Sequence, residues 1–295
     1  MASRLRIGIT LGDVAGIGPE IVAKALASRK LDRRFDYEVI GAPHTKRRAD
    51  AIKWVVQGAR RCLAGELAAL VTAPISKRLL RDAGYRFEGH TELLAHIAHV
   101  KRFAMMLVGG PPSPKTDSGL RRASPLRVAL VTIHVPLSKV PRLLSTKRIT
   151  EVIELSHDAC KRFGIRRPKI GVAGLNPHAG ESGLLGGEER RIITPAIRSA
   201  KRKGLNVTGP WPADTLFHKA YLGEFDAVVA MYHDQGLAPL KMIAFDSGVN
   251  LTLGLPFVRT SPDHGTAFDI AGKGIANPNS MIAAINLAAR FARAR

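Results

Sequence analysis

The sequence predicts an α/β protein built from two domains. Apolar runs rich in strand-forming residues alternate along the chain with segments of helical periodicity, which is typical of parallel sheets covered by helices. The length of 295 residues exceeds the usual size of a single hydrophobic core. Polar residues stand directly after several apolar runs, at the sheet edge where α/β proteins bind ligands. The first domain is expected at about 1–125 plus 245–295, and the second at about 126–244.

Composition disfavours several other classes of protein. No apolar run approaches the roughly 18 residues of a membrane span, and Met1–Gly12 contains no signal-peptide core, so we expect a cytoplasmic protein without a membrane partner. The formal net charge is +21, but the basic residues are scattered and only 5% of residues are aromatic. A solvated basic surface is therefore favoured over a specific nucleic-acid site. Cys62 and Cys160 stand far apart and are expected to be reduced core residues.

The N-terminal segment predicts a strand, a glycine-rich turn and a helix. Leu5–Thr10 alternates as a strand, and the helix opens with Pro19 and Glu20, which suit the first turn. Gly12–Gly18 lies between them, where the backbone could approach an anion. The spacing differs from G-x-G-x-x-G, however, so a tight turn that needs small residues explains the glycines equally well. Strands are then expected at Tyr37–Ile40, Ala68–Thr72 and Ala104–Val108, and helices at Ala51–Leu63 and Arg78–Ala83.

The tetrad GHTE at Gly89–Glu92 precedes a further apolar pattern of helical period. Thr91 is expected to cap this helix. His90 stands just before the helix, where backbone N–H groups and an imidazole are suited to hold a phosphate or a carboxylate. Farther along, Gly109–Pro125 is rich in proline and lacks periodicity, so we expect an exposed loop that is either functional or disordered.

Three histidines, His134, His178 and His233, each stand at or just beyond the end of a predicted strand. A single strand-end histidine is more often a structural residue, but three in one α/β chain are harder to explain that way. Because parallel strands end at the same sheet edge, the imidazoles could converge on one divalent cation with positions left open for substrate or water. Asp214 and Asp234 are candidates to orient an imidazole or to move a proton. The strands are expected at Arg127–Ile133, Lys169–Gly174 and Ala227–Tyr232, with helices at Leu137–Leu144 and Ile149–Phe163.

Long segments of the chain resemble, in the same order, the 4-hydroxythreonine-4-phosphate dehydrogenase family of pyridoxal phosphate biosynthesis. The resemblance covers nearly the whole chain, and so many long motifs in one order are highly specific. The segments are GDVAGIGPE at Gly12–Glu20, GHTE at Gly89–Glu92, the strand-end His134, LNPHAGE at Leu175–Glu181, PADTLF at Pro212–Phe217, MYHDQG at Met231–Gly236, GVNLTLGLPFVRTS at Gly248–Ser261 and DHGTAFDIAGKG at Asp263–Gly274.

This resemblance implies a two-domain α/β/α architecture similar to the isocitrate and isopropylmalate dehydrogenases, with the active site in the interdomain cleft and at the interface of a homodimer. It implies that a divalent metal, such as zinc, magnesium or cobalt, is bound by His134, His178 and His233. It implies that the phosphorylated substrate is bound by His90, Thr91, Lys241, Asn250 and Arg259. The cofactor is expected to be NAD or NADP, in a loop at 263–279 that contains Asp263, His264, Gly265 and Asn277.

The reaction implied by the resemblance oxidises 4-phosphohydroxy-L-threonine at C3. The resulting β-keto acid loses carbon dioxide and leaves 3-amino-2-oxopropyl phosphate. Asp214, Asp234 and Lys241 are our acid–base candidates. Two alternatives stay open: a paralogous dehydrogenase of D-threonate or D-erythronate 4-phosphate, and a basic nucleic-acid-binding protein on an inherited fold. The connection between Ile40 and Ala51 is shorter than the family leads us to expect, and the loop at 110–125 is longer.

Overall fold

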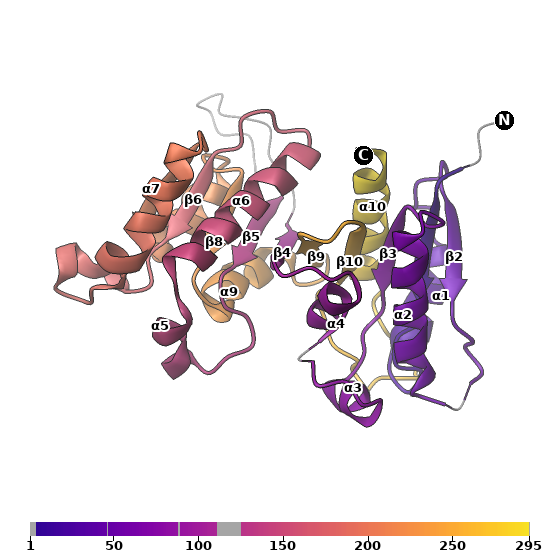
Figure 1. Ribbon diagram of the computed structural model, residues 1–295. Coiled ribbons are helices and arrows are strands. Elements are labelled where there is room, and N and C mark those ends of the chain that lie inside the picture. Colours follow the sequence, from indigo (N-terminus) through magenta and orange to yellow (C-terminus); the bar gives the residue numbers. More distant parts are fainter. Residues whose placement is uncertain (1–3, 46, 88, 111–124, 295) are drawn as a thin grey trace. The chain divides into compact units, whose positions relative to one another are not determined.

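A computed structural model describes residues 4–45, 47–87, 89–110 and 125–294 of the chain. The chain divides into two compact units (Figure 1), of which unit 1 comprises Met1–Lys101 and Asp246–Arg295 and unit 2 comprises Arg102–Phe245. The first break lies at 101/102 rather than near 125, because strand β4 (Ala104–Gly109) pairs with β5 (Leu126–Leu130) of unit 2. Most of the loop predicted at Gly109–Pro125 lies outside the described residues.

The sheet of unit 1 has the strand order β2-β1-β3-β10-β9. Its first four strands are parallel, and β9 runs antiparallel to β10. All residues of β3 and β10 are buried; β3 therefore reads as an apolar run without alternation, whereas β10 buries the polar residues Arg259, Thr260 and Ser261. The strands are β1 (Arg6–Thr10), β2 (Asp36–Ile40), β3 (Ala69–Thr72), β9 (Val249–Leu253) and β10 (Val258–Pro262).

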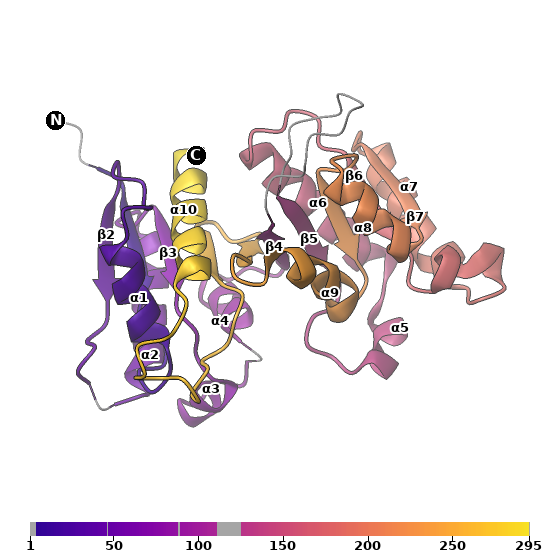
Figure 2. The same ribbon diagram turned by 180° about the vertical axis from the view of Figure 1, so that it is seen from behind.

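Helices cover both faces of this sheet. The Thr260 hydroxyl donates to the carbonyl of Ala284 in α10, so the neighbouring residue Arg259 points to the opposite face. Figure 1 shows α2 and α4 on that opposite face, and Figure 2 shows α1 and α10 on the other. The Ser76 hydroxyl caps α3 by accepting from the Leu79 amide at 3.2 Å. The helices are α1 (Gly18–Ala27), α2 (Asp50–Leu63), α3 (Lys77–Asp82), α4 (His90–Ile97) and α10 (Asn279–Arg293).

The sheet of unit 2 has the strand order β4-β5-β8-β6-β7, in which β4 is antiparallel to β5 and the other pairs are parallel. Its remaining strands are β6 (Ile170–Ala173), β7 (Val207–Trp211) and β8 (Ala227–Ala230). Leu130 and Val228 pack with Leu216 of α8 and Leu240 of α9, whereas α6 and α7 pack on the other face, as Figures 1 and 2 show. The helices are α6 (Thr146–Arg162), α7 (Thr194–Arg202), α8 (Ala213–Tyr221) and α9 (His233–Ala244).

The local structure agrees with the sequence prediction at the two cysteines and differs from it in the segment after β5. Cys62 and Cys160 are buried thiols outside any disulfide, as predicted. The helix predicted at Leu137–Leu144 is instead a 3-10 turn, η1 (Leu137–Lys139), followed by a single α-helical turn, α5 (Val140–Leu143), whose second residue is proline. Within the described residues, no helix is both long enough and apolar enough to cross a bilayer.

Candidate active site

The strand order of unit 2 brings the three histidine-bearing segments to one sheet edge. Strands β5, β8 and β6 are adjacent and parallel, so the segments that leave their carboxyl ends start side by side. The segment after β5 carries His134, the segment after β8 carries His233, and the segment after β6 carries His178. The predicted strands end two or three residues earlier than expected at β5 and β8, and His233 is the first residue of α9.

His134 and His233 form a close pair. Their ring centroids lie 5.4 Å apart, and both side chains line a pocket of ≈ 240 Å³ together with Asp234 and Tyr232. The His233 Nδ1 atom lies 2.6 Å from the Asp234 carboxylate. This contact engages Nδ1 and orients the ring, so that Nε2 is the nitrogen that can bind a metal. Two imidazoles at this spacing, one of them oriented by a carboxylate, suit a divalent transition metal.

His178 lies in an unusual backbone conformation. It belongs to the 3-10 segment η2 (Pro177–Gly183), in which the five residues from His178 to Ser182 all have positive φ angles. The L-residues among them are strained there, which is typical of functional loops. His178 itself is exposed. The described residues contain no group of three His, Cys, Asp or Glu side chains placed to hold a metal, so His178 does not join the other two histidines within this chain.

Two polar side chains that the sequence analysis did not single out as site residues hold these strand ends in place. The buried Glu189, in the π-helical segment η3 (Glu189–Ile193), accepts from the amides of Leu175 at 2.8 Å and Asn176 at 2.7 Å, just ahead of His178. The Gln235 side chain accepts from the Met231 amide after β8 and donates to the Gly174 carbonyl after β6, both at 2.7 Å. These long-range contacts leave no periodic signal in the sequence.

We expect Glu189→Ala to destabilise the protein by about 2–4 kcal/mol. The substitution removes the hydrogen-bond acceptor of the Leu175 and Asn176 amides and of the Asn176 side chain. Urea titration monitored by circular dichroism measures the change. Glu188→Ala is the matched control, since the half-buried Glu188 accepts from the Asn176 side chain and the Gly187 amide but not from the amides of Leu175 and Asn176, which donate to Glu189. Equal midpoints for the two variants would contradict this account of the loop.

Unit 1 contains a buried cation with neutral partners. Arg259 on β10 is only 1% exposed. Its Nε and Nη2 atoms donate to the Thr72 hydroxyl at 3.2 and 2.7 Å, and Nη1 donates to the Thr252 hydroxyl at 3.0 Å. Burial lowers the pKa of Arg259 to about 10, although Glu92 opposes the shift. A buried guanidinium without a bonded carboxylate is costly, so the arrangement fits an anion that arrives from solution.

Other predicted substrate residues of unit 1 lie in the same region. The buried atoms His90 Nε2 and Asn250 Oδ1 have no hydrogen-bond partner among the described residues. Burial, and then the positive charge of Arg259, lowers the pKa of His90 well below its ordinary value, so the imidazole is neutral and can donate one N–H. Thr91 is buried in the first turn of α4 but does not cap it, because Gly89 is the N-cap residue; that prediction was wrong. An N–H of His90 suits a phosphate or carboxylate oxygen, whereas the Asn250 oxygen can accept from a ligand group that donates.

We expect the free energy of unfolding to decrease as the pH falls below 6.5. The unfolded chain takes up a proton on His90 near pH 6.5, whereas the folded chain resists protonation because its pKa is lowered. Stability is therefore fully present above that pH and is lost below it, by at most about 1.4 kcal/mol per pH unit. Urea titrations from about pH 5 to 8 measure the slope. A slope that is unchanged in His90→Asn would contradict the assignment.

The predicted cofactor loop connects β10 to α10. His264 Nδ1 lies 3.1 Å from the carbonyl of Gly265, and its buried Nε2 atom has no partner among the described residues. Lys24 and Glu20 of α1 fasten the loop through the backbone of Gly274 and Ala276. The glycine-rich turn also supports the loop, since the Ile17 amide donates to the Thr266 carbonyl at 3.0 Å.

The other predicted cofactor and acid–base residues lie on the loop after β10 and on helices α8 and α9. Asp263 is half-buried and Gly265 is exposed, while the Asn277 side chain accepts from the Asn279 amide and so stabilises the start of α10. Asp214 is exposed in the first turn of α8, a helix that contacts η2. Lys241 is half-buried on α9 in unit 2, with its Nζ atom 5.9 Å from the ring centroid of Phe245.

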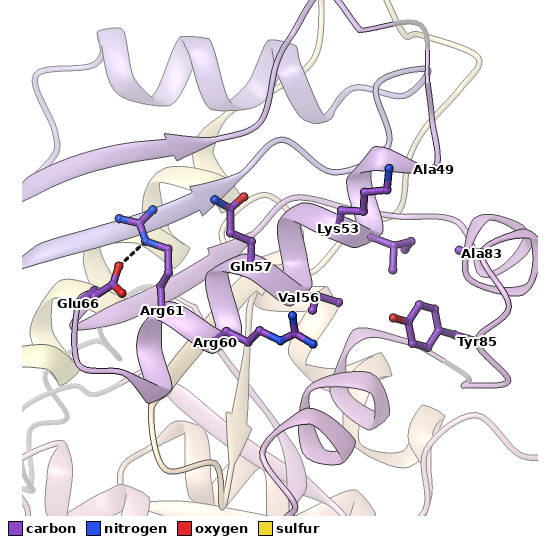
Figure 3. A pocket seen from close by; sticks show the side chains of 10 residues that line it. Ala49, Lys53, Val56, Gln57, Arg60, Arg61, Glu66, Ala83 and Tyr85 are labelled. Atoms are coloured by element: carbon purple, nitrogen blue, oxygen red, sulfur yellow. Dashed lines mark hydrogen bonds and ion pairs between the residues drawn. The ribbon is translucent and has the colours of Figure 1, made fainter.

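A separate pocket of ≈ 910 Å³ lies along α2 (Figure 3). Figure 3 shows Lys53, Gln57 and Arg60 on the helix and Tyr85 across the hollow. Among the described residues, none of the predicted site residues lines this pocket. Arg61 is already paired with glutamates, its Nε atom lying 3.0 Å from Glu66. We therefore place the functional site at the strand ends and not in this pocket.

Solved structures define the class of protein. The crystal structure of 4-hydroxythreonine-4-phosphate dehydrogenase from Klebsiella pneumoniae matches with a TM-score of 0.82 and 38% identity, over 98% of this chain and 100% of that one. Isocitrate dehydrogenase from Methylococcus capsulatus matches with a TM-score of 0.54 and 17% identity, over 98% of this chain and 88% of that one, which shows a shared fold. The chain thus has the α/β dehydrogenase fold that the sequence predicted.

Sequence relatives identify the family. The model for "Pyridoxal phosphate biosynthetic protein PdxA" matches residues 17–288, and the chain belongs to this family. The 4-hydroxythreonine-4-phosphate dehydrogenase of Geobacter metallireducens is 43% identical over 340 aligned residues, covering 98% of this chain and 96% of the relative. A relative from Oceanobacillus iheyensis named "Putative D-threonate 4-phosphate dehydrogenase" is 39% identical, over 99% of both chains. The alignment exceeds the 295 residues of this chain, so the relative contains residues that this chain lacks.

Proposed function

We propose that the protein is an NAD(P)- and metal-dependent 4-hydroxythreonine-4-phosphate dehydrogenase of pyridoxal phosphate biosynthesis. It oxidises 4-phosphohydroxy-L-threonine at C3, and decarboxylation then yields 3-amino-2-oxopropyl phosphate. The observation that carries the proposal is the buried Arg259, whose hydrogen-bond partners among the described residues are hydroxyl groups and whose charge acts on His90, a residue with a buried Nε2 atom that has no partner there. Such a site recognises a phosphorylated substrate. Family membership and the named relatives supply the reaction.

The phosphate is bound by Arg259, His90, Thr91 and Asn250. Arg259 supplies charge and paired N–H donors, while the neutral His90 and the Asn250 amide supply directional hydrogen bonds. Burial of the site raises the cost of leaving these groups unpaired, which favours a phosphorylated substrate over one that lacks the phosphate. We also propose that Lys241 of unit 2 binds the substrate and takes part in proton transfer.

The metal is bound by His134, His178 and His233. The pair of rings, the orienting Asp234 carboxylate and the all-nitrogen donor set fit zinc or cobalt better than magnesium. A divalent ion held by these residues would supply Lewis-acid chemistry, which stabilises negative charge on a substrate oxygen. Asp234 holds the His233 ring in one tautomer, and Asp214, on a helix that contacts the His178 segment, is positioned to exchange a proton.

A homodimer would complete this site. His178 does not reach the other histidines within the described chain, so a second subunit is the simplest source of the third imidazole. Exposed apolar side chains support an interface beside the histidines: Leu137 near His134 is 66% exposed, and Leu184 near His178 is 84% exposed. Isologous pairing would bury two such patches at once and build two equivalent sites.

NAD or NADP is bound at the loop that contains Asp263, His264, Gly265 and Asn277. The buried, unpartnered Nε2 atom of His264 supports this place, since a ligand group can satisfy it. The exposed Gly265 has no heavy atom near the position of a Cβ, which leaves space beside the loop. A nicotinamide cofactor held by this loop would supply the hydride acceptor for the oxidation. We also propose the cytoplasm as the location, where the two free cysteines stay reduced.

A second candidate function is oxidation of D-threonate or D-erythronate 4-phosphate. It is favoured by the relative of Oceanobacillus iheyensis at 39% identity. The residues discussed above recognise a phosphate and a metal, and an amino group on the substrate is not needed for either contact.

The test is formation of NADH or NADPH by the purified protein with each of the three substrates. The metal is removed by a chelator and then restored with zinc, cobalt or magnesium. Metal-dependent turnover of 4-phosphohydroxy-L-threonine is the expected result. A clear preference for a sugar-acid phosphate would assign the second function. Failure with all three substrates at verified metal occupancy would overturn both.

A further inference from the structure

We propose that Thr72 and Thr252 are positioning residues that hold Arg259 through neutral hydroxyl groups, so that its full charge remains for the substrate phosphate. The inference rests on the proposed function and deepens it. Neither threonine was singled out by the sequence analysis, and both are buried, with Thr72 at 0% and Thr252 at 4% exposure.

Strand order alone brings these residues together. Thr72 is the last residue of β3 and Thr252 lies on β9, and these are the two strands that flank β10 in unit 1. Arg259 pairs in register with Leu70, so its side chain extends along the sheet face toward Thr72, two residues farther on. The guanidinium therefore donates hydrogen bonds to both neighbouring strands, from Nε and Nη2 to Thr72 and from Nη1 to Thr252.

The chemistry of the partners decides what the guanidinium can do. A carboxylate would hold it more strongly but would neutralise it, and the bound anion would then compete with that carboxylate. Hydroxyl oxygens accept hydrogen bonds without adding a charge. The three contacts use three of the five N–H groups, which leaves one on each Nη atom without a partner among the described residues. Two such groups on one planar fork match two phosphate oxygens.

The surroundings of Arg259 agree with this role. The charge of Arg259 acts on His90, which carries the buried and unpartnered Nε2 atom. Glu92 in α4 acts on Arg259 electrostatically, yet no carboxylate of the described chain lies within ion-pair distance of it. If Arg259 served only to stabilise the fold, two hydroxyls would be poor compensation for burying its charge.

The experiment compares Thr72→Val and Thr252→Val with Thr72→Ser and Thr252→Ser. Valine keeps the shape and β-branching but removes the hydroxyl, whereas serine keeps the hydroxyl. We expect each valine variant to weaken binding of inorganic phosphate, measured by isothermal titration calorimetry, by about 10-fold or more. KM for the phosphorylated substrate should rise by a similar factor, with a much smaller change in kcat. The serine variants should stay within about 3-fold of the wild type.

Each outcome has a defined meaning. Valine variants that bind phosphate as the wild type does would overturn the inference and leave the proposed function standing. Serine variants as weak as the valine variants would also overturn it, since packing rather than the hydroxyl would then matter. A wild type that binds no phosphate would overturn the phosphate site itself. Melting temperatures of the four variants identify any loss that comes from misfolding.

Discussion

Arg259→Met is expected to lower kcat/KM by about 10²- to 10⁴-fold while leaving the protein at least as stable as the wild type. The loss follows because the substitution removes the buried cation of the proposed phosphate site. Stability is expected to move the other way, since a buried guanidinium that lacks a bonded carboxylate costs free energy and methionine fills a similar volume. Steady-state kinetics and thermal melting of the same preparation measure the two effects.

Arg259→Lys is the matched control. Lysine keeps a positive charge but lacks the planar fork that reaches both threonines and the phosphate, so we expect an intermediate loss of activity. If the methionine variant keeps the wild-type KM for the phosphorylated substrate, Arg259 does not bind the phosphate. If it unfolds, Arg259 is a structural residue, and the site has to be sought elsewhere.

A mixture of His134→Ala and His178→Ala subunits is expected to recover activity that neither variant has alone. His134 and His233 form a pair within one chain, whereas His178 does not join them. If the third imidazole comes from the second subunit, a mixed dimer contains one intact set of ligands and one doubly damaged set. Random pairing then restores about a quarter of the wild-type activity. Co-expression with two different affinity tags, followed by tandem purification, isolates the mixed dimer for assay and metal analysis.

The control is a mixture of His134→Ala and His233→Ala. Both substitutions damage the same half of the site, so every site in the mixed dimer is defective and activity should stay absent. Absence of recovery in the first mixture as well would show that all three histidines come from one chain. In that case the strained segment around His178 would have to rearrange when the metal binds.

Much of the fold could be predicted because the relevant patterns are local. Buried parallel strands such as β3 and β8 appear as short apolar runs, and amphipathic helices such as α2 and α6 appear as a repeat of about 3.6 residues. Errors arose where local patterns are weak. A proline-containing segment was predicted as one helix at Leu137–Leu144, and Thr91 was expected to cap a helix that begins beside it.

The site was predictable in part, for a similar reason. His134, His178 and His233 attract attention because each follows a strand, and strand ends are recognisable in a sequence. Gln235 also follows a predicted strand, but its bonding partners could not be read from the sequence, and Glu189 gave no strand-end signal at all. Gln235 acts on a carbonyl 61 residues away, and Glu189 acts on amides 13 and 14 residues away across a loop with left-handed geometry. Hydrogen bonds of this kind depend on the tertiary fold, which brings distant segments of the chain into contact.

The sequence by itself determined the α/β class, the family and the polar residues at the strand ends, because periodicity and contiguous motifs are properties of neighbouring residues. Only the tertiary structure decided which of those residues meet. The order β5-β8-β6 places the histidine segments side by side, and the order β3-β10-β9 sets Arg259 between hydroxyls rather than beside a carboxylate. Thr72 and Arg259 are 187 residues apart in the chain. The charge state and ligand preference of a buried group follow from such partners, which the order of strands in a sheet supplies and local sequence does not.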